Sequence, residues 1–129
     1  MKVLLDTHVL LWWLRDRAQI GPGARALIAS PHDQIFVSVV SLWEIAIKYR
    51  LGKLDVRSAD AARLADGEGF ARLPVEPAHV ARAETLRVIE RHRDPFDQML
   101  LAQAAVEQAA LMTGDGVLSR YGIPCISMA

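Results

Sequence analysis

The sequence of 129 residues contains a single cysteine, Cys125, and no long hydrophobic run. A lone cysteine excludes an intrachain disulfide, which fits a reducing cytosol better than secretion. The longest apolar run, Val9–Leu14, is far shorter than the roughly 20 residues that a membrane span needs. Asp6 places a carboxylate too early for a signal peptide. We therefore expect a cytoplasmic protein with no membrane association.

An excess of charge is also missing, because 15 lysine and arginine residues balance 15 aspartate and glutamate residues. A formal net charge of zero excludes binding to polyanions through gross positive charge, although it allows a local basic patch. Apolar residues make up 52% of the chain, which is enough for one packed core and too much for a disordered chain. With no repeat or linker in evidence, we expect a single domain over residues 1–129.

Short apolar or β-branched runs alternate with helical patterns along the chain. Strands are expected at 2–5, 35–40, 70–75, 111–113 and 124–128. Helices are expected at 7–15, 24–29, 41–52, 58–65, 77–91 and 94–109. Such alternation predicts a three-layer α/β domain, in which a parallel sheet is covered by helices on both faces.

Acidic residues occur where the predicted strands end or the next helices begin. They are Asp6, Glu44, Asp94, Asp97 and Asp115. In open parallel sheets, ligands bind beyond the carboxyl ends of the strands. The predicted topology therefore brings residues that are far apart in sequence to one edge of the sheet.

Several carboxylates in one cleft repel one another, and a divalent cation relieves this repulsion while keeping them ionised. Oxygen ligands favour Mg²⁺ or Mn²⁺ over Zn²⁺. Such an ion activates water and stabilises charge on a phosphoryl group, so we expect phosphodiester hydrolysis. The candidate catalytic and metal-binding residues are Asp6, Glu44, Asp97 and Asp115, and the candidate supporting residues are Asp94, Thr7 and Thr113.

Each of these acids also has a purely structural interpretation. Asp6 is suited to cap a helix that begins near Thr7, and Asp94 before a proline is typical of a helix N-cap. Ser41 and Glu44 have the spacing of a capping box, which is as good an explanation for Glu44 as a catalytic role. Asp97 suits the positive end of a helix, and Asp115 lies between two glycines, as turn residues often do.

The ordered set of motifs resembles the PIN-domain ribonucleases of the VapC toxin type. The matching segments are Leu4–His8, Leu11–Leu14, Ser38–Ile45, His92–Asp97, Leu101–Ala104 and Thr113–Asp115. The resemblance implies a PIN-like sheet of five strands in the order 3-2-1-4-5, RNA cleavage with Mg²⁺ or Mn²⁺, a homodimer, and inhibition by a cognate VapB-type antitoxin. It carries the metal-binding acids over to Asp6, Glu44, Asp97 and Asp115, with Asp94 nearby.

Two positions depart from the pattern of that family. Gln98 stands where relatives often carry arginine, and Gly114 stands where a larger residue is frequent. Neither difference removes a carboxylate. The serious alternative is a PIN fold that is catalytically silent and serves as a binding or scaffold module. A receiver domain, a haloacid-dehalogenase-type phosphatase and a dinucleotide-binding domain each lack their required motifs here.

Cations and tryptophans near the predicted site are candidates for binding partners. The candidate RNA-contacting residues are Lys48, Arg50, Lys53 and Arg93, all suited to contacting phosphates. Trp12 and Trp13 point about 100° apart on their helix, so we expect one to pack in the core and the other to line a protein contact. No role follows from sequence for His8 or His92.

Overall fold

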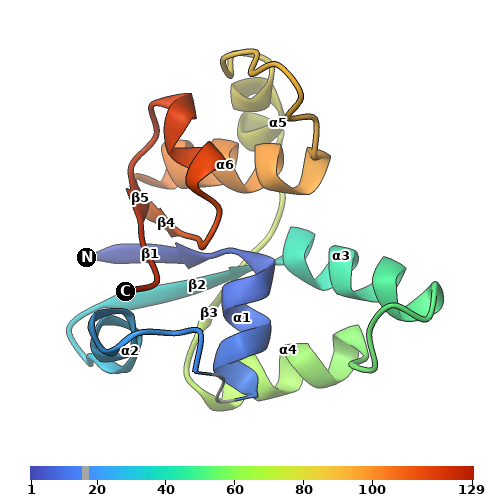
Figure 1. The fold of residues 1–129 in the computed structure, drawn as a ribbon, viewed down its shortest axis with the longest axis vertical. Helices are drawn as coiled ribbons and strands as arrows, with labels where there is room; N and C mark the ends of the chain where they lie inside the picture. Colours follow the sequence, from blue (N-terminus) through green and yellow to red (C-terminus); the bar gives the residue numbers. More distant parts are fainter. Residues whose placement is uncertain (16–17) are drawn as a thin grey trace.

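The computed structural model describes residues 1–15 and 18–129 and contains a parallel five-stranded sheet between two layers of helices (Figure 1). The strands are β1 Lys2–Leu5, β2 Gln34–Ser38, β3 Ala71–Leu73, β4 Ala110–Met112 and β5 Cys125–Ile126. They lie in the order β3-β2-β1-β4-β5, and every neighbouring pair is parallel. The order 3-2-1-4-5 implied by the resemblance is thus confirmed.

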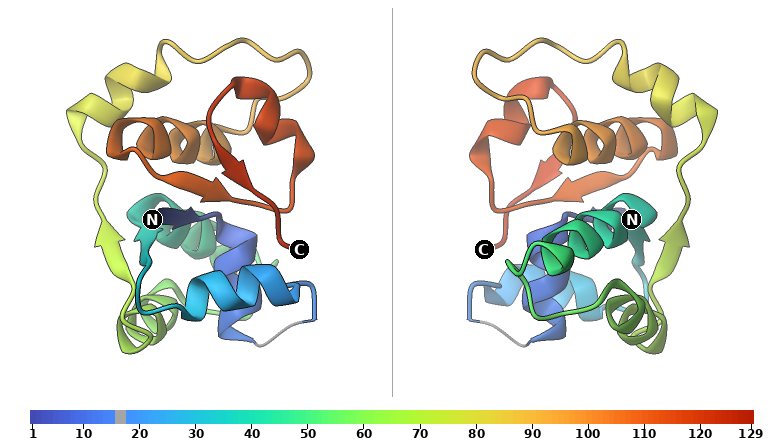
Figure 2. Two further views of the ribbon diagram at one scale, coloured as in Figure 1. Left: turned by 90° about the vertical axis from the view of Figure 1, so that its left-hand side faces the viewer. Right: turned by 90° about the vertical axis from the view of Figure 1, so that its right-hand side faces the viewer.

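Helices cover both faces of this sheet. They are α1 Thr7–Leu14, α2 Pro22–Ala29, α3 Val39–Arg50, α4 Ser58–Gly67, α5 Pro77–Ala83 and α6 Pro95–Glu107, with a 3₁₀ helix, η1, at Gly116–Tyr121. Figure 2 shows α5, α6 and η1 on one side of the sheet and α1, α2 and α4 on the other. Helix α3 continues outward from the end of β2, beyond the edge of the sheet (Figure 1).

The central strand β1 explains why two separate cores form. Its residues Val3, Leu4 and Leu5 are all fully buried, because both faces of a parallel strand are covered. Val3 and Leu5 pack into the core cluster that includes α1, α2 and α4, whereas Leu4 packs into the cluster that includes α6 and η1. The alternation of side chains along one strand therefore joins the two layers.

The boundary between β2 and α3 differs from the expectation. The strand ends at Ser38 rather than at residue 40, and α3 begins at Val39 rather than at Ser41. The hydroxyl of Ser38 accepts a hydrogen bond from the Val40 backbone N–H at 3.0 Å, so Ser38 is the N-cap. Because Ser41 lies inside the helix, the capping-box explanation for Glu44 is wrong.

The segment after α5 also differs, because the helix expected at 77–91 ends at Ala83. The hydroxyl of Thr85 donates a hydrogen bond to the Arg82 carbonyl at 2.8 Å. In a continuing helix, this carbonyl would instead accept from a backbone N–H group of the next turn. The chain then runs irregularly to Asp94, with Arg91 in the left-handed region at φ 67°. The 3₁₀ helix η1 was not expected from the sequence. None of the described helices is both long and apolar enough to cross a membrane.

Candidate functional site

Asp6 lies at the carboxyl end of β1 and is only 5% exposed. One carboxylate oxygen accepts a hydrogen bond from the Val9 N–H at 3.1 Å and so caps α1. The other accepts from the hydroxyl of Thr113, just after β4, at 2.5 Å. Asp6 is therefore both an N-cap and a fixed carboxylate at the edge of the sheet, so the structural and functional interpretations are compatible. Thr7 donates instead to the Ser41 hydroxyl at 3.0 Å, so it does not contact a carboxylate through this bond.

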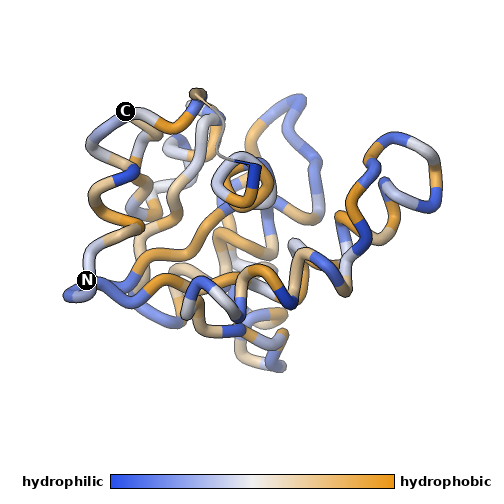
Figure 3. The backbone as a smooth tube through the Cα atoms, turned by 90° about the horizontal axis from the view of Figure 1, so that it is seen from below, coloured by the Kyte–Doolittle hydropathy of each residue, from blue (hydrophilic) through white to orange (hydrophobic). Residues whose placement is uncertain are grey.

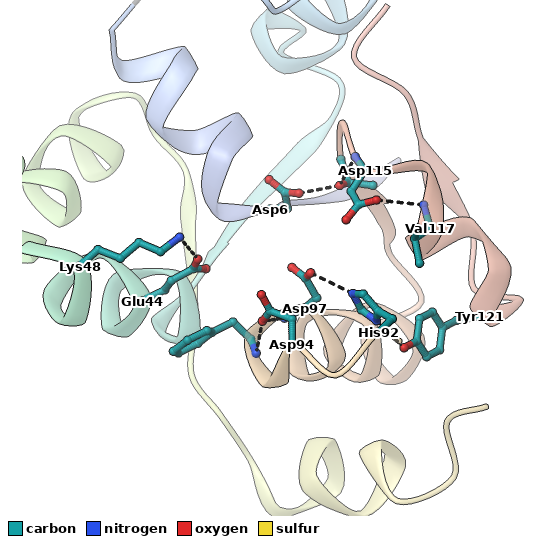
Figure 4. A network of polar contacts seen from close by, with 11 residues as sticks. Asp6, Glu44, Lys48, His92, Asp94, Asp97, Asp115, Val117 and Tyr121 are labelled. Atoms are coloured by element: carbon teal, nitrogen blue, oxygen red, sulfur yellow. Dashed lines mark hydrogen bonds and ion pairs between the residues drawn. The ribbon is translucent and has the colours of Figure 1, made fainter. Parts of the chain in front are cut away.

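The start of α6 supplies two further acids. Asp94 is the N-cap, as its interpretation from sequence predicts, because it accepts hydrogen bonds from the backbone N–H groups of Phe96 and Asp97. Asp97 lies in the first turn and faces Asp6 (Figure 4). Burial raises the pKa of Asp97 to about 6, and the charges of Asp94 and Asp6 contribute to this increase. This carboxylate is therefore costly to ionise without a nearby cation.

His92 is the functional candidate that the sequence did not reveal. Its Nε2 atom is 3.2 Å from Asp97 Oδ2, and its Nδ1 atom is 2.6 Å from the Tyr121 hydroxyl. Ligand atoms of His92, Asp97 and Asp115 all lie within 4.8 Å of one another. The only signal in the sequence was the position of His92 two residues before Asp94, within the motif shared with the PIN ribonucleases.

Asp115 lies in the turn between β4 and η1 and is exposed. Its carboxylate caps η1 by accepting from the Val117 N–H at 3.0 Å, and its own N–H donates to the Thr113 hydroxyl at 3.1 Å. Thr113 therefore contacts both Asp6 and Asp115. Figure 4 shows the carboxylates of Asp6, Asp97 and Asp115 turned toward a common space.

Glu44 comes from α3, to one side of this space (Figure 4). It is buried, and its carboxylate forms an ion pair with Lys48 Nζ at 2.7 Å. Glu44 does not belong to the group of closely spaced ligand atoms found among the described residues. The structure thus groups Asp97, Asp115 and His92 most closely, places Asp6 beside them, and pairs Glu44 with a lysine.

The candidate RNA-contacting cations fall into two groups, one paired within the protein and one exposed. Lys48 is directed at Glu44, whereas Arg50, Lys53 and Arg93 are exposed. Arg50 and Lys53 lie at the end of α3 and in the projecting loop that follows it, where hydrophilic residues recur (Figure 3). Their role in RNA binding stays a prediction.

Comparison with known proteins identifies the family of this chain. Residues 3–124 match the PIN domain. A stretch of 60 residues, 44% of this chain, is 40% identical to Ribonuclease VapC16 of Mycobacterium tuberculosis, and the match spans 43% of that protein. The fold is similar to VapBC2 from Rickettsia felis bound to a promoter DNA fragment, with a TM-score of 0.73, 16% identity and 98% coverage of both chains. It is also similar to VapBC-1 from nontypeable Haemophilus influenzae, with a TM-score of 0.70, 18% identity and coverage of 99% of this chain and 98% of the other. With nearly its whole length matched and the sheet order in agreement, the chain belongs to the PIN domain family.

Proposed function

We propose that this protein is a divalent-metal-dependent endoribonuclease of the VapC toxin type. The observation that carries the proposal is the meeting of the Asp6, Asp97 and Asp115 carboxylates at the carboxyl edge of a PIN-domain sheet. The partial identity to a ribonuclease of the VapC type supports the same activity. An acidic cleft of this kind suits phosphodiester chemistry only when a cation balances its charge.

The donor set fits such a cation. The carboxylates of Asp97 and Asp115 and the imidazole of His92 are closely spaced, and the carboxylate of Asp6 lies beside them (Figure 4). Burial raises the pKa of Asp97 to about 6, and the negative charges of Asp94 and Asp6 add to this increase, so a cation would stabilise its ionised form. Oxygen ligands suit Mg²⁺ and Mn²⁺, and an imidazole nitrogen shifts the preference toward the transition metal. Asp6, Asp97 and Asp115 would hold the ion, with His92 as a fourth ligand or as the residue that orients Asp97.

A bound divalent ion would supply an activated water and positive charge opposite the scissile phosphate. The residues of the chain have distinct tasks around it. Thr113 fixes the orientation of the Asp6 carboxylate, and His92 fixes that of Asp97. Asp94 is engaged with two backbone N–H groups, so its role is to begin α6 and position Asp97. Glu44 would bind the ion only if the ion displaced Lys48 from its carboxylate.

The direct test is cleavage of single-stranded RNA by the purified protein in Mg²⁺ or Mn²⁺. Asp6→Asn and Asp97→Asn remove charge but keep the shape of the side chain, and Asp6→Asn also keeps an oxygen that can cap α1. We therefore expect folded proteins whose cleavage rate is lower by at least about a hundredfold. Near-normal cleavage by either variant would reject the site. Metal binding by the wild-type protein without any cleavage would instead favour the catalytically silent binding module.

The proposed partners are RNA as substrate, a second copy of the chain and a VapB-type antitoxin. The structural neighbours from Rickettsia felis and Haemophilus influenzae are VapBC2 and VapBC-1. Trp43 is well suited to such a contact, because it is 60% exposed and its ring forms a T-shaped contact with Phe96. Light scattering at about 20–50 μM tests the homodimer, since a specific dimer with micromolar Kd is assembled at that concentration.

A further inference from the structure

A hollow of about 430 Å³ lies directly beside the candidate metal ligands. Its lining residues are Asp6, His8, Trp12, Gly114, Asp115 and Gly116. Its volume is within the range of roughly 300–1,000 Å³ that is usual for small-ligand pockets. Two of the carboxylates assigned to the metal thus share one cavity with two aromatic rings, a combination that metal binding alone does not explain.

The aromatic rings form one surface. His8 and Trp12 are four residues apart on α1 and so lie on the same face of the helix, with ring centroids 5.7 Å apart and planes inclined by 36°. His8 is exposed, and Trp12 is half-buried against the core cluster beneath it. Because Asp6 caps this same helix, the rings are held at a fixed distance from the carboxylate.

Gly114 keeps this surface accessible. A Cβ atom at position 114 would lie 3.8 Å from Trp12 Cζ3 and 3.4 Å from Met128 Sδ, so a longer side chain would extend over the tryptophan or against the methionine. Gly114 is not among the residues with positive φ, so its backbone conformation does not require glycine. The glycine that departs from the family pattern therefore leaves space rather than relieving strain.

Building on the proposed function, we propose that this hollow binds a nucleobase of the RNA next to the scissile phosphate, with the base stacked on Trp12 and His8. Every base has a π face, and stacking on aromatic side chains is the usual way in which proteins hold unpaired bases. The lining residues in the described part of the chain include no lysine or arginine, so the hollow suits an uncharged base rather than a phosphate. The phosphate is then left to face Asp97 and the metal.

The chain offers a matched control for this proposal. Trp13 is the next residue of α1 and is half-buried against the same core cluster, but its ring contacts Phe70 with centroids 6.3 Å apart and does not line the hollow. Trp12→Leu and Trp13→Leu therefore each remove one indole ring that packs against the same core cluster. Gly114→Leu fills the hollow from the opposite wall, and Trp12→Phe keeps an aromatic face.

The test is binding of a fluorescently labelled single-stranded oligoribonucleotide of mixed sequence, measured by anisotropy in Mn²⁺. All variants are made in an Asp97→Asn background so that the RNA stays intact. Losing one stacked base is expected to raise the Kd about tenfold in Trp12→Leu and Gly114→Leu. Trp13→Leu is expected to leave the Kd unchanged, and Trp12→Phe to show an intermediate value.

Equal Kd values for Trp12→Leu, Gly114→Leu and Trp13→Leu would overturn the base site, as would a lack of RNA binding by the background protein. Circular dichroism establishes that each variant is folded, and the exposed His8→Ala variant tests the same surface if Trp12→Leu unfolds. Cleavage by the wild-type protein is assayed separately. If RNA binding depends on Trp12 but the wild-type protein does not cleave RNA, the nuclease proposal is refuted and the base site is kept. If the wild-type protein cleaves RNA but binding does not depend on Trp12, the base site is refuted and the nuclease proposal is kept.

Discussion

Lys48 holds its ammonium group 2.7 Å from the carboxylate of Glu44, one turn earlier in α3, and only 6% of the Glu44 side chain is exposed. A buried carboxylate is strongly destabilising unless a partner balances it. Lys48 therefore stabilises Glu44 in the metal-free protein, and a divalent ion that binds Glu44 has to compete with an existing charge.

Replacing Lys48 with methionine is expected to lower the free energy of unfolding in EDTA by about 1–3 kcal/mol. This loss of stability is smaller than the cost of breaking a fully buried ion pair, because 34% of the Lys48 side chain is exposed and water screens its charge. Denaturant unfolding measures the loss, and added Mn²⁺ should restore more stability to the variant than to the wild type. Arg50→Met, in the same last turn of α3, is the control. Equal stabilisation of both variants by Mn²⁺ would show that Glu44 does not meet the metal.

Asp97→Asn is expected to raise the melting temperature of the metal-free protein at neutral pH. The pKa of Asp97 is raised by burial from 3.8 to about 6, so the ionised carboxylate opposes folding above pH 6. As the pH falls from 6 toward 4, the folded wild type takes up a proton before the unfolded chain does, and its disadvantage relative to the variant shrinks. Thermal melts in EDTA across this range check the trend. A difference that stays constant with pH would contradict this assignment.

His92→Ala is expected to weaken Mn²⁺ binding more than Mg²⁺ binding. The imidazole is the one nitrogen donor in the cluster with Asp97 and Asp115, and nitrogen ligands favour transition metals. Loss of a residue that only orients Asp97 would weaken both ions equally, by roughly 10- to 100-fold. Calorimetric titration with each ion separates these outcomes, and His32→Ala at an exposed position is the control.

RNA binding is expected to weaken as salt increases. If Arg50, Lys53 and Arg93 contact phosphates, replacing all three by serine should make the slope of log K against log salt shallower by roughly 0.7 per lost contact for a single strand. Filter binding between low and moderate salt measures the slope. Arg63 and Arg72 are paired with aspartates elsewhere, so their double serine variant should retain the wild-type slope. An unchanged slope in the triple variant would place the RNA on another surface.

The alternation of apolar runs and helical patterns was sufficient to predict the parallel sheet, because both depend on local periodicity. The exact start of α3 and the end of α5 were not predictable in this way. Each is decided by one hydroxyl, that of Ser38 and that of Thr85, which competes for a backbone partner. Local propensity does not reveal which of several nearby hydroxyl residues wins this competition.

The candidate site shows the same limit. Acids at predicted strand ends were identifiable because topology alone brings them to one edge. His92 was not, since its orientation depends on Tyr121, which follows 29 residues later in a 3₁₀ helix that the sequence did not indicate. The pairing of Glu44 with Lys48 has the i,i+4 spacing of a helix ion pair, but its burial depends on the packing of α3 against its neighbours.

Asp6 caps a helix of one layer, and Asp97 lies in the first turn of a helix of the other, with the central strand between their two cores. The spacing of these carboxylates therefore depends on how the two layers slide relative to each other. Displacements of about 1 Å are enough to cost a hundredfold in rate for positioned catalytic groups. A substitution in either core that shifts α1 or α6 on the sheet would therefore lower the activity without changing any residue of the cleft.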